Sequence, residues 1–235
     1  MSTHHALVIL QARTGSQRLP GKVLAPLLHW PLVEYCIRRL VAAGVGTVVL
    51  ATTTRDEDRP ILALGASLGV DVHAGPDDDV LGRFAQVAER FPESSHVIRA
   101  TADNPFVDLG TCGRILKLLD AGADYAVEEA LPYGTAVEGL RREVLLRAQR
   151  EASTAHDREH VTPWVRRHEH LVRMSPTAPE DVRAPELRFT VDTPDDLAYA
   201  RRLAADLHLE GHDPRLAALP QVIAAARRLP VGGGL

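Results

Sequence analysis

A cluster of cations follows the first apolar run of the chain and could bind a polyanion. Residues 11–22 read QARTGSQRLPGK, so that Arg13, Arg18 and Lys22 stand in a segment with two glycines. Glycine lets backbone N–H groups approach phosphate oxygens closely, and the three side chains supply the opposite charge. Lys22 adds weight, because only two of the 27 basic residues are lysines, the other being Lys117. We therefore predict a phosphate-binding loop, against the alternative of a solvated basic loop.

Two known phosphate-binding motifs do not account for this loop. Five residues separate Gly15 from Gly21, whereas a Walker loop has four, and Val23 stands where that motif has serine or threonine. Gly44 and Gly46 could suggest a dinucleotide fingerprint, but they precede a predicted strand instead of following one. The sequence therefore contains neither a Walker loop at residues 15–23 nor a dinucleotide fingerprint at residues 44–46.

Two isolated aspartates each follow a predicted strand and could hold a metal ion. Asp103 stands in the sequence TADNP and Asp192 in the sequence TVDTP, 89 positions later. Ligands of α/β sheets bind at the carboxyl ends of the strands, so both side chains can converge on one rim. Carboxylates there suit Mg²⁺, which binds one or two protein oxygens and completes its shell with water and phosphate. Helix capping is the alternative role for aspartates in this segment. It explains Asp196, which could form a capping box with Thr193, but it does not explain Asp192.

Other polar clusters have simpler explanations. The three aspartates at 77–79 precede a predicted helix, whose dipole favours acids in its first turn. Asp79 and Arg83 are one helical turn apart and could form a local ion pair. His156 and His160 have the spacing of zinc ligands on a helix, but a third ligand and the HExxH motif are both missing. We therefore assign no metal to these groups.

The elements that must position these residues follow an alternating pattern. Short apolar runs alternate with amphipathic ones, which is typical of strands feeding helices in an α/β protein. Strands are expected at 6–11, 47–51, 70–73, 96–99, 125–128, 135–140 and 187–191. Helices are expected from residue 32 to a stop at Gly44, and at 59–68, 79–90, 111–121, 143–152, 194–207 and 215–229. We predict a mostly parallel, layered sheet with a mixed edge, in one domain over residues 1–235.

Composition narrows the class of protein. The 27 basic and 31 acidic residues give a net charge of −4, which disfavours a nucleic-acid partner. The first apolar run, at 6–10, is too short for a signal peptide or a membrane span. Cys36 and Cys112 are too few for a disulfide framework, so we expect a cytoplasmic protein with no membrane partner.

Taken in order, these segments resemble a known family. They are similar to the cytidylyltransferases of the spore-coat polysaccharide SpsF type, relatives of the enzymes that make CMP-Kdo and CMP-sialic acid. The resemblance extends from residue 11 to about residue 203. The segments that carry it are 11–24, 51–53 with Asp58, 79–84, 99–105, 158–163 and 191–196.

The resemblance implies a fold, a donor and a cofactor. The fold would be the three-layer nucleotide-diphospho-sugar transferase (GT-A-like) fold, with CTP as donor and Mg²⁺ held by Asp103 and Asp192. Arg13 and Lys22 would face the triphosphate and act in catalysis. The nucleotide-binding residues would be Ala12, Arg13, Gly15, Ser16, Lys22, Thr53, Asp79 and Arg83. By the same resemblance we expect a homodimer.

The acceptor is the part of the reaction that the sequence defines least. We expect an acceptor oxygen to attack the α-phosphorus of CTP, with Glu138, Arg158 and His160 on the acceptor side, or else in structural pairs. Related proteins carry Pro-Arg-Gly-x-Asp-x-Glu where this chain has Tyr133 and Ala136 in place of the arginine and the aspartate. We expect a small anionic acceptor, such as a sugar acid or a phosphonate, because Arg158 could hold a carboxylate or phosphonate bidentately. The alternatives are a glycosyltransferase that uses a sugar nucleotide, or a catalytically decayed scaffold subunit that binds nucleotide.

Overall fold

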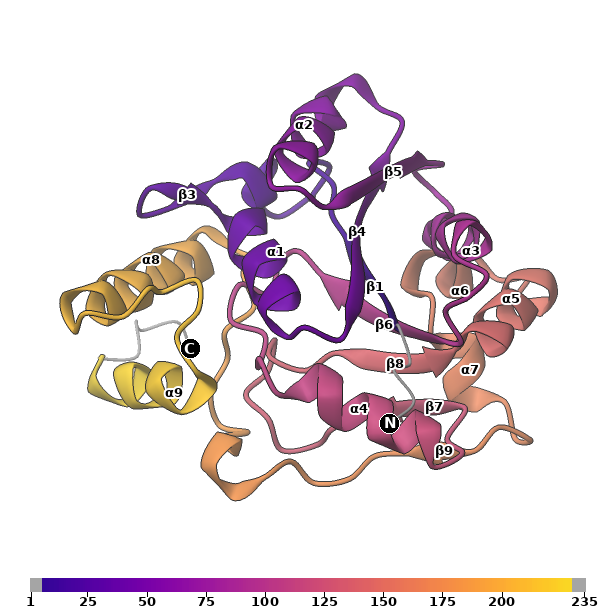
Figure 1. Ribbon diagram of the computed structural model, residues 1–235. Helices are drawn as coiled ribbons and strands as arrows, with labels where there is room; N and C mark the ends of the chain where they lie inside the picture. The colour runs from indigo at the N-terminus through magenta and orange to yellow at the C-terminus, as the bar shows by residue number, and fades with distance from the viewer. Residues whose placement is uncertain (1–5, 230–235) are drawn as a thin grey trace.

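The computed structural model describes residues 6–229, which form a twisted central sheet with helices on both faces (Figure 1). Four parallel strands make up one side of the sheet, and their neighbours at the other side include an antiparallel strand. The strand order is β5 (Asp71–Gly75), β4 (Gly46–Thr53), β1 (Ala6–Gln11), β6 (His96–Thr101), β8 (Glu138–Arg141), β7 (Tyr125–Val127) and β9 (Arg173–Met174). β8 is antiparallel to both β6 and β7, which gives the mixed edge.

The helices form a layer on each face of this sheet (Figure 1). One layer holds α1 (Leu32–Ala42), α2 (Arg59–Ser67), α4 (Thr111–Asp120), α8 (Pro194–Leu209) and α9 (Leu219–Arg228). The other holds α3 (Val80–Arg90), α5 (Arg142–Glu151), α6 (Ala155–His160) and α7 (Pro163–Arg167). Side chains alternate along a strand, so Val8 and Leu10 pack on the first layer while Leu7 and Ile9 pack on the second. β1 is therefore buried on both faces, as expected for a central parallel strand.

Short elements complete the chain. Three 3₁₀ turns are η1 (Lys22–Leu24), η2 (Asp56–Asp58) and η3 (Glu180–Val182), and a small hairpin pairs β2 (Pro26–Leu27) with β3 (Trp30–Pro31). Within residues 6–229, none of the helices combines the length and the apolar character needed to cross a membrane.

The expected strands up to residue 140 and all the expected helices are present, with ends that move by at most four residues. The strand predicted at 187–191 is wrong. Tyr133 N–H donates to Leu187 O (2.9 Å) and Phe189 N–H to Tyr133 O (2.8 Å), which makes one isolated bridge. Gly134, at a φ of 90°, turns the partner chain away before a second bridge can form. The segment is consequently extended but belongs to no strand.

Candidate active site

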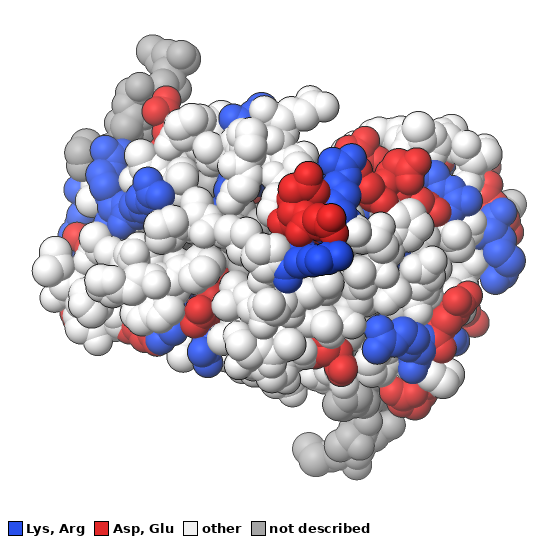
Figure 2. Space-filling model, turned by 90° about the horizontal axis from the view of Figure 1, so that it is seen from above, with Lys and Arg blue, Asp and Glu red and all other residues white. Residues whose placement is uncertain are grey.

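A large open cleft of about 1540 Å³ lies at the end of the sheet that is formed by the carboxyl ends of β1, β4 and β6. Its walls include the segment after β1, the turn after β5, the first residue of β8 and one side of α6. Acidic and basic side chains are interspersed in small groups on the face seen in Figure 2, with neutral surface between them. The cleft thus lies where ligands of α/β sheets usually bind.

The segment after β1 closes on itself, and we call residues 12–22 the cationic loop. Ser16 N–H and Gly21 N–H both donate to the carbonyl oxygen of Thr14, at 2.8 and 2.9 Å. Gly21 has a φ of 71°, a left-handed conformation that favours glycine. Ala12 N–H donates to Ala51 O (3.0 Å), so neither Ala12 nor Ser16 has an unused amide. Gly15 N–H makes no hydrogen bond within the described chain and lines the cleft, so it can receive an anion.

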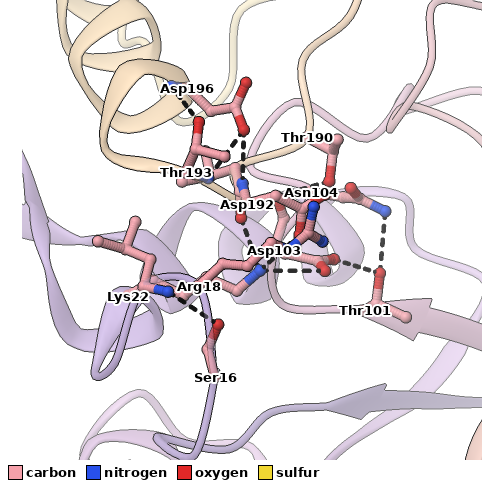
Figure 3. A network of polar contacts seen from close by, with 12 residues as sticks. Ser16, Arg18, Lys22, Thr101, Asp103, Asn104, Thr190, Asp192, Thr193 and Asp196 are labelled. Atoms are coloured by element: carbon pink, nitrogen blue, oxygen red, sulfur yellow. Dashed lines mark hydrogen bonds and ion pairs between the residues drawn. The ribbon is translucent and has the colours of Figure 1, made fainter.

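Lys22 ends the cationic loop and lies between the two aspartates (Figure 3). Its ammonium is 3.0 Å from Asp192 Oδ1 and 3.4 Å from Asp103 Oδ2, and it donates to Val191 O at 2.7 Å. The Lys22 side chain is only 9% exposed, so this ammonium is largely removed from water. The structure thereby brings together a cation and two carboxylates that are far apart in the sequence.

Hydrogen bonds from neighbouring residues orient the carboxylate of Asp103. Thr101 Oγ1 donates to Asp103 Oδ1 at 2.6 Å, and Asn104 Nδ2 donates to Thr101 Oγ1 at 2.9 Å. Val191 N–H donates to the carbonyl oxygen of Asp103 at 2.8 Å, which draws the segment containing Asp192 alongside. The end of β6 therefore fixes both carboxylates.

Asp192 stands just before α8, in a strongly basic setting. Thr193 and Asp196 form the expected capping box of that helix, which leaves the Asp192 carboxylate available for other contacts. Arg18 and Arg188 approach it at 2.9 and 2.7 Å, in addition to Lys22. Burial would raise the pKa of Asp192, but the three cations more than offset it and hold the pKa below its ordinary value.

These carboxylates fit a magnesium ion better than a zinc ion. The described chain contains no cluster of three or more His, Cys, Asp or Glu side chains that could hold a metal by itself. Mg²⁺ needs fewer protein ligands, because it usually keeps water and takes substrate phosphate oxygens as further ligands. The Lys22 ammonium between Asp103 and Asp192 shows that both carboxylates face one point where positive charge is accommodated.

Two of the expected arginines lie near the turn after β5. Arg13 lines the cleft and pairs with Asp77 (3.6 Å) and Glu159 (3.3 Å). Arg83 also lines the cleft, although its side chain is almost fully buried, and it donates to the carbonyl oxygens of Pro76 and Asp77. Arg83 therefore shapes the turn after β5, while Arg13 remains partly exposed.

Three expected site residues do not line the cleft. Thr53 is buried, and its hydroxyl donates to Asp58. Asp79 caps α3 by accepting a hydrogen bond from Gly82 N–H (2.8 Å), and it pairs with Arg158 at 3.3 Å. The suggested ion pair of Asp79 with the arginine at position 83 is wrong, since that arginine binds backbone carbonyl oxygens instead. Thr53, Asp79 and Arg158 therefore bind other protein groups and do not form part of the cleft lining.

Glu138, His160 and the two positions that depart from the family pattern also line the cleft. Glu138 accepts hydrogen bonds from Thr162 Oγ1 (2.9 Å), the Tyr125 hydroxyl and the Arg99 guanidinium, which lock its orientation. His160 lines the cleft next to the ring of His156 (4.6 Å between ring centroids). Tyr133 is 62% exposed in the cleft with the Arg188 guanidinium 4.7 Å from its ring centroid, and Ala136 lies in the same wall.

Three further residues shape the site although no sequence motif marked them individually, namely Arg99, Thr162 and Arg188. Arg99 and Thr162 stand inside segments that carried the resemblance, so their position was the available signal. Arg188 was placed inside a strand that does not form, and its contact with Asp192 follows from the actual path of that segment.

Comparisons with known proteins bear on the family and on the fold. A family model described as cytidylyltransferase matches residues 7–216. The spore coat polysaccharide biosynthesis protein SpsF of Bacillus subtilis is 36% identical over 205 residues, which cover 84% of this chain and 85% of that protein. Among solved structures, a cytidylyltransferase from Leptospira borgpetersenii has a TM-score of 0.84 at 20% identity, over 98% of this chain and 100% of that one.

A second similar solved structure contains bound CTP. It is CMP:2-keto-3-deoxy-manno-octonic acid synthetase complexed with CTP, with a TM-score of 0.62 at 19% identity, over 86% of this chain and 98% of that one. At such identities the two structures bear on the fold. They confirm the expected three-layer, mostly parallel nucleotide-diphospho-sugar transferase fold.

Proposed function

The chain belongs to the cytidylyltransferase family, and we propose that it is a magnesium-dependent enzyme that transfers CMP from CTP to a small anionic acceptor. The observation that carries the proposal is the meeting of Lys22, Asp103 and Asp192 beside the cationic loop. Asp103 and Asp192 would hold Mg²⁺, which neutralises phosphate charge when bound. Arg13, Lys22 and the amide of Gly15 would bind the triphosphate, with Ala12 and Ser16 shaping the loop and Arg83 the nearby turn.

The reaction needs positioning and charge compensation more than covalent help from the protein. An oxygen of the acceptor forms a bond to the α-phosphorus as the bond from that phosphorus to the bridging oxygen breaks. Pyrophosphate leaves as the CMP-linked product forms, and the proton of the attacking hydroxyl passes to solvent water. Arg13 and Lys22 offset the negative charge on the phosphates, which lowers the barrier relative to water.

The acceptor would bind between the start of β8 and α6. Glu138 and His160 line that part of the cleft, and His160 is not held by an ion pair within residues 6–229. We retain these two residues as acceptor contacts and assign Arg158 to the support of Asp79, because the two are paired. Tyr133 and Ala136 make this wall less charged than the family pattern, so they bear on which acceptor fits.

Two measurements test the proposal in sequence. A thermal-shift screen of the four nucleoside triphosphates with Mg²⁺ should show the largest stabilisation with CTP, because binding to the folded state raises the melting temperature. Pyrophosphate release is then measured with CTP and a panel of sugar acids and phosphonates. Stabilisation by CTP, together with pyrophosphate release in the presence of at least one acceptor, supports the proposal. A melting temperature that none of the four triphosphates changes would reject it.

The same measurements separate the two alternatives. A glycosyltransferase would release no pyrophosphate, and the relatives described above give it no support. A decayed scaffold would bind CTP and Mg²⁺ but turn over no acceptor. The persistence of Arg13, Lys22, Asp103 and Asp192 in one cleft favours the enzyme.

Three further features belong to the same proposal. We expect one catalytic domain over the chain, a cytoplasmic protein and, by resemblance to the family, a homodimer. Both cysteines, Cys36 and Cys112, are buried free thiols, in keeping with a reducing compartment. Light scattering coupled to size-exclusion chromatography tests the dimer, and a mass of one chain would refute it.

A further inference from the structure

Within residues 6–229, the buried carboxylate of Asp58 is held by hydrogen bonds and not by an ion pair. Asp58 is fully buried and makes no ion pair within residues 6–229. Its Oδ1 accepts hydrogen bonds from Thr14 N–H (2.8 Å) and Thr14 Oγ1 (2.7 Å), and its Oδ2 accepts one from the Thr53 hydroxyl. Because removing a charge from water is costly, such an arrangement requires an explanation.

Helix capping does not explain Asp58. The residue immediately precedes α2, where an aspartate ordinarily accepts a hydrogen bond from an amide of the first turn. Its side chain makes no capping bond and turns instead toward Thr14, which is 44 positions earlier in the chain. The contact therefore serves the cationic loop and not the helix.

Thr14 transmits this contact through the cationic loop. Its amide and hydroxyl are held by Asp58, and its carbonyl oxygen accepts the amides of Ser16 and Gly21. Gly21 directly precedes Lys22, whose ammonium reaches the two aspartates of the rim. Thr14 thus connects the buried Asp58 carboxylate to the turn that immediately precedes Lys22.

We propose that Asp58 is a positioning residue that acts through Thr14 to hold the cationic loop in the conformation that directs Lys22 to the rim. The kinetic part of this inference rests on the proposed function, since it takes the loop as the triphosphate site. Hydrogen bonds from Thr53 and Thr14 also outweigh the effect of burial and hold the pKa of Asp58 below its ordinary value, so the carboxylate stays ionised at neutral pH.

A pair of substitutions at Thr14 tests the contact without removing the buried charge. Thr14→Val keeps the shape of the side chain and loses the hydroxyl, whereas Thr14→Ser keeps the hydroxyl. A hydrogen bond to a charged group is strong enough that Thr14→Val should lower kcat/KM for CTP roughly tenfold or more. Thr14→Ser should stay close to the wild type, and equal effects of both variants would overturn the proposal.

Asp58→Asn and its neighbour provide the matched comparison. Asp56 lies in the same 3₁₀ turn, but its side chain is 82% exposed and pairs only with Arg59 among the described residues. Asp58→Asn should raise the KM for CTP and lower kcat, while Asp56→Asn should leave both unchanged. If the two variants differ only in melting temperature and not in these constants, Asp58 is merely structural and the proposal fails.

Hydrogen exchange reports on the loop whether or not the chain turns over CTP. Without any ligand, the amides of Ser16 and Gly21 should exchange faster in Asp58→Asn than in the wild type, and in Thr14→Val than in Thr14→Ser. Unchanged exchange over residues 14–22 would overturn the positioning role. Faster exchange in a protein that shows no CTP binding would leave Asp58 as the loop anchor while rejecting the proposed function.

Discussion

The Lys22 ammonium lies between Asp103 and Asp192, 3.4 Å from one carboxylate and 3.0 Å from the other. It also donates to the carbonyl oxygen of Val191, so all three interactions draw the cationic loop toward the segment before α8. The Lys22 charge therefore lies between two acids that would otherwise repel each other. Each partner's contribution can be tested separately.

Replacing Lys22 should impair turnover far more than stability. A cation that stabilises transition-state charge is typically worth about 2.7–4 kcal/mol, so Lys22→Met should lower kcat roughly a hundredfold or more. The rate of pyrophosphate release from CTP measures the effect. Lys117→Met is the control, since it removes the other lysine of the chain, which is exposed on α4. Equal rates for the two variants would show that Lys22 has no role in catalysis.

Lys22 should also compete with a metal ion that arrives without nucleotide. In the wild type the ammonium lies between the two carboxylates, so free Mn²⁺ must displace it in order to bind there. The Lys22→Met variant has no ammonium to displace. We expect electron paramagnetic resonance titration to give tighter Mn²⁺ binding by the variant in the absence of CTP. Tighter binding by the wild type would mean that the metal binds elsewhere.

Asp103→Asn and Asp192→Asn should both abolish metal-dependent pyrophosphate release, but with different effects on stability. Asp192 pairs with Arg18, Lys22 and Arg188, whereas Asp103 faces only one of these cations. Removing the Asp192 charge leaves a buried ammonium less compensated, so its variant should melt at the lower temperature.

The control for these two variants is Asp195→Asn. Asp195 is an exposed acid in the first turn of α8, next to the same segment. It should retain the activity and nearly all the stability of the wild type. Near-normal turnover in both Asp103→Asn and Asp192→Asn would refute the metal site.

Stability at low pH should depend on Asp157, which anchors the helix carrying His156 and His160. Hydrogen bonds from Arg167, together with one from Thr154, lower the pKa of the buried Asp157 carboxyl from 3.8 to about 2. Since the pKa is lowered in the folded state, the stabilisation is complete above about pH 4 and is lost as the pH falls toward 2.

The size of this effect is limited because Arg167 is half exposed and its charge is partly screened by water. We expect Asp157→Asn to lower the free energy of unfolding by at most about 2 kcal/mol at pH 7. Denaturant unfolding at several pH values should show the difference between variant and wild type shrinking below pH 4. A difference that does not change with pH would contradict the pKa of this group.

The convergence of distant residues could be predicted from the sequence where geometry leaves little choice. Carboxyl ends of neighbouring parallel strands meet at one edge, so a cationic loop after β1 and an aspartate after β6 had to lie close together. The continuous apolar run of β1 likewise identifies a strand buried on both faces. These inferences depend on the spacing of apolar residues and on the order of strands and helices, both of which can be read from the sequence.

Side-chain contacts were less predictable. Asp79 and Arg158 both stand in segments that marked the family, yet they bind each other and do not line the cleft. Asp58 directly precedes a helix, yet its carboxylate accepts hydrogen bonds from Thr14, far away in the sequence, and does not cap that helix. The strand expected at 187–191 failed because a single glycine turn in its neighbour ends the pairing. Such outcomes depend on the tertiary path of a second segment, which local patterns do not contain.

The most direct test is a crystal structure of the wild type with CTP and Mn²⁺, using anomalous scattering to locate the metal. We expect one manganese peak within ligand distance of both Asp103 and Asp192, with the triphosphate along the cationic loop and the Lys22 ammonium moved onto a phosphate oxygen. A manganese peak away from these two carboxylates, or a triphosphate bound outside residues 12–22, would contradict the proposed active site.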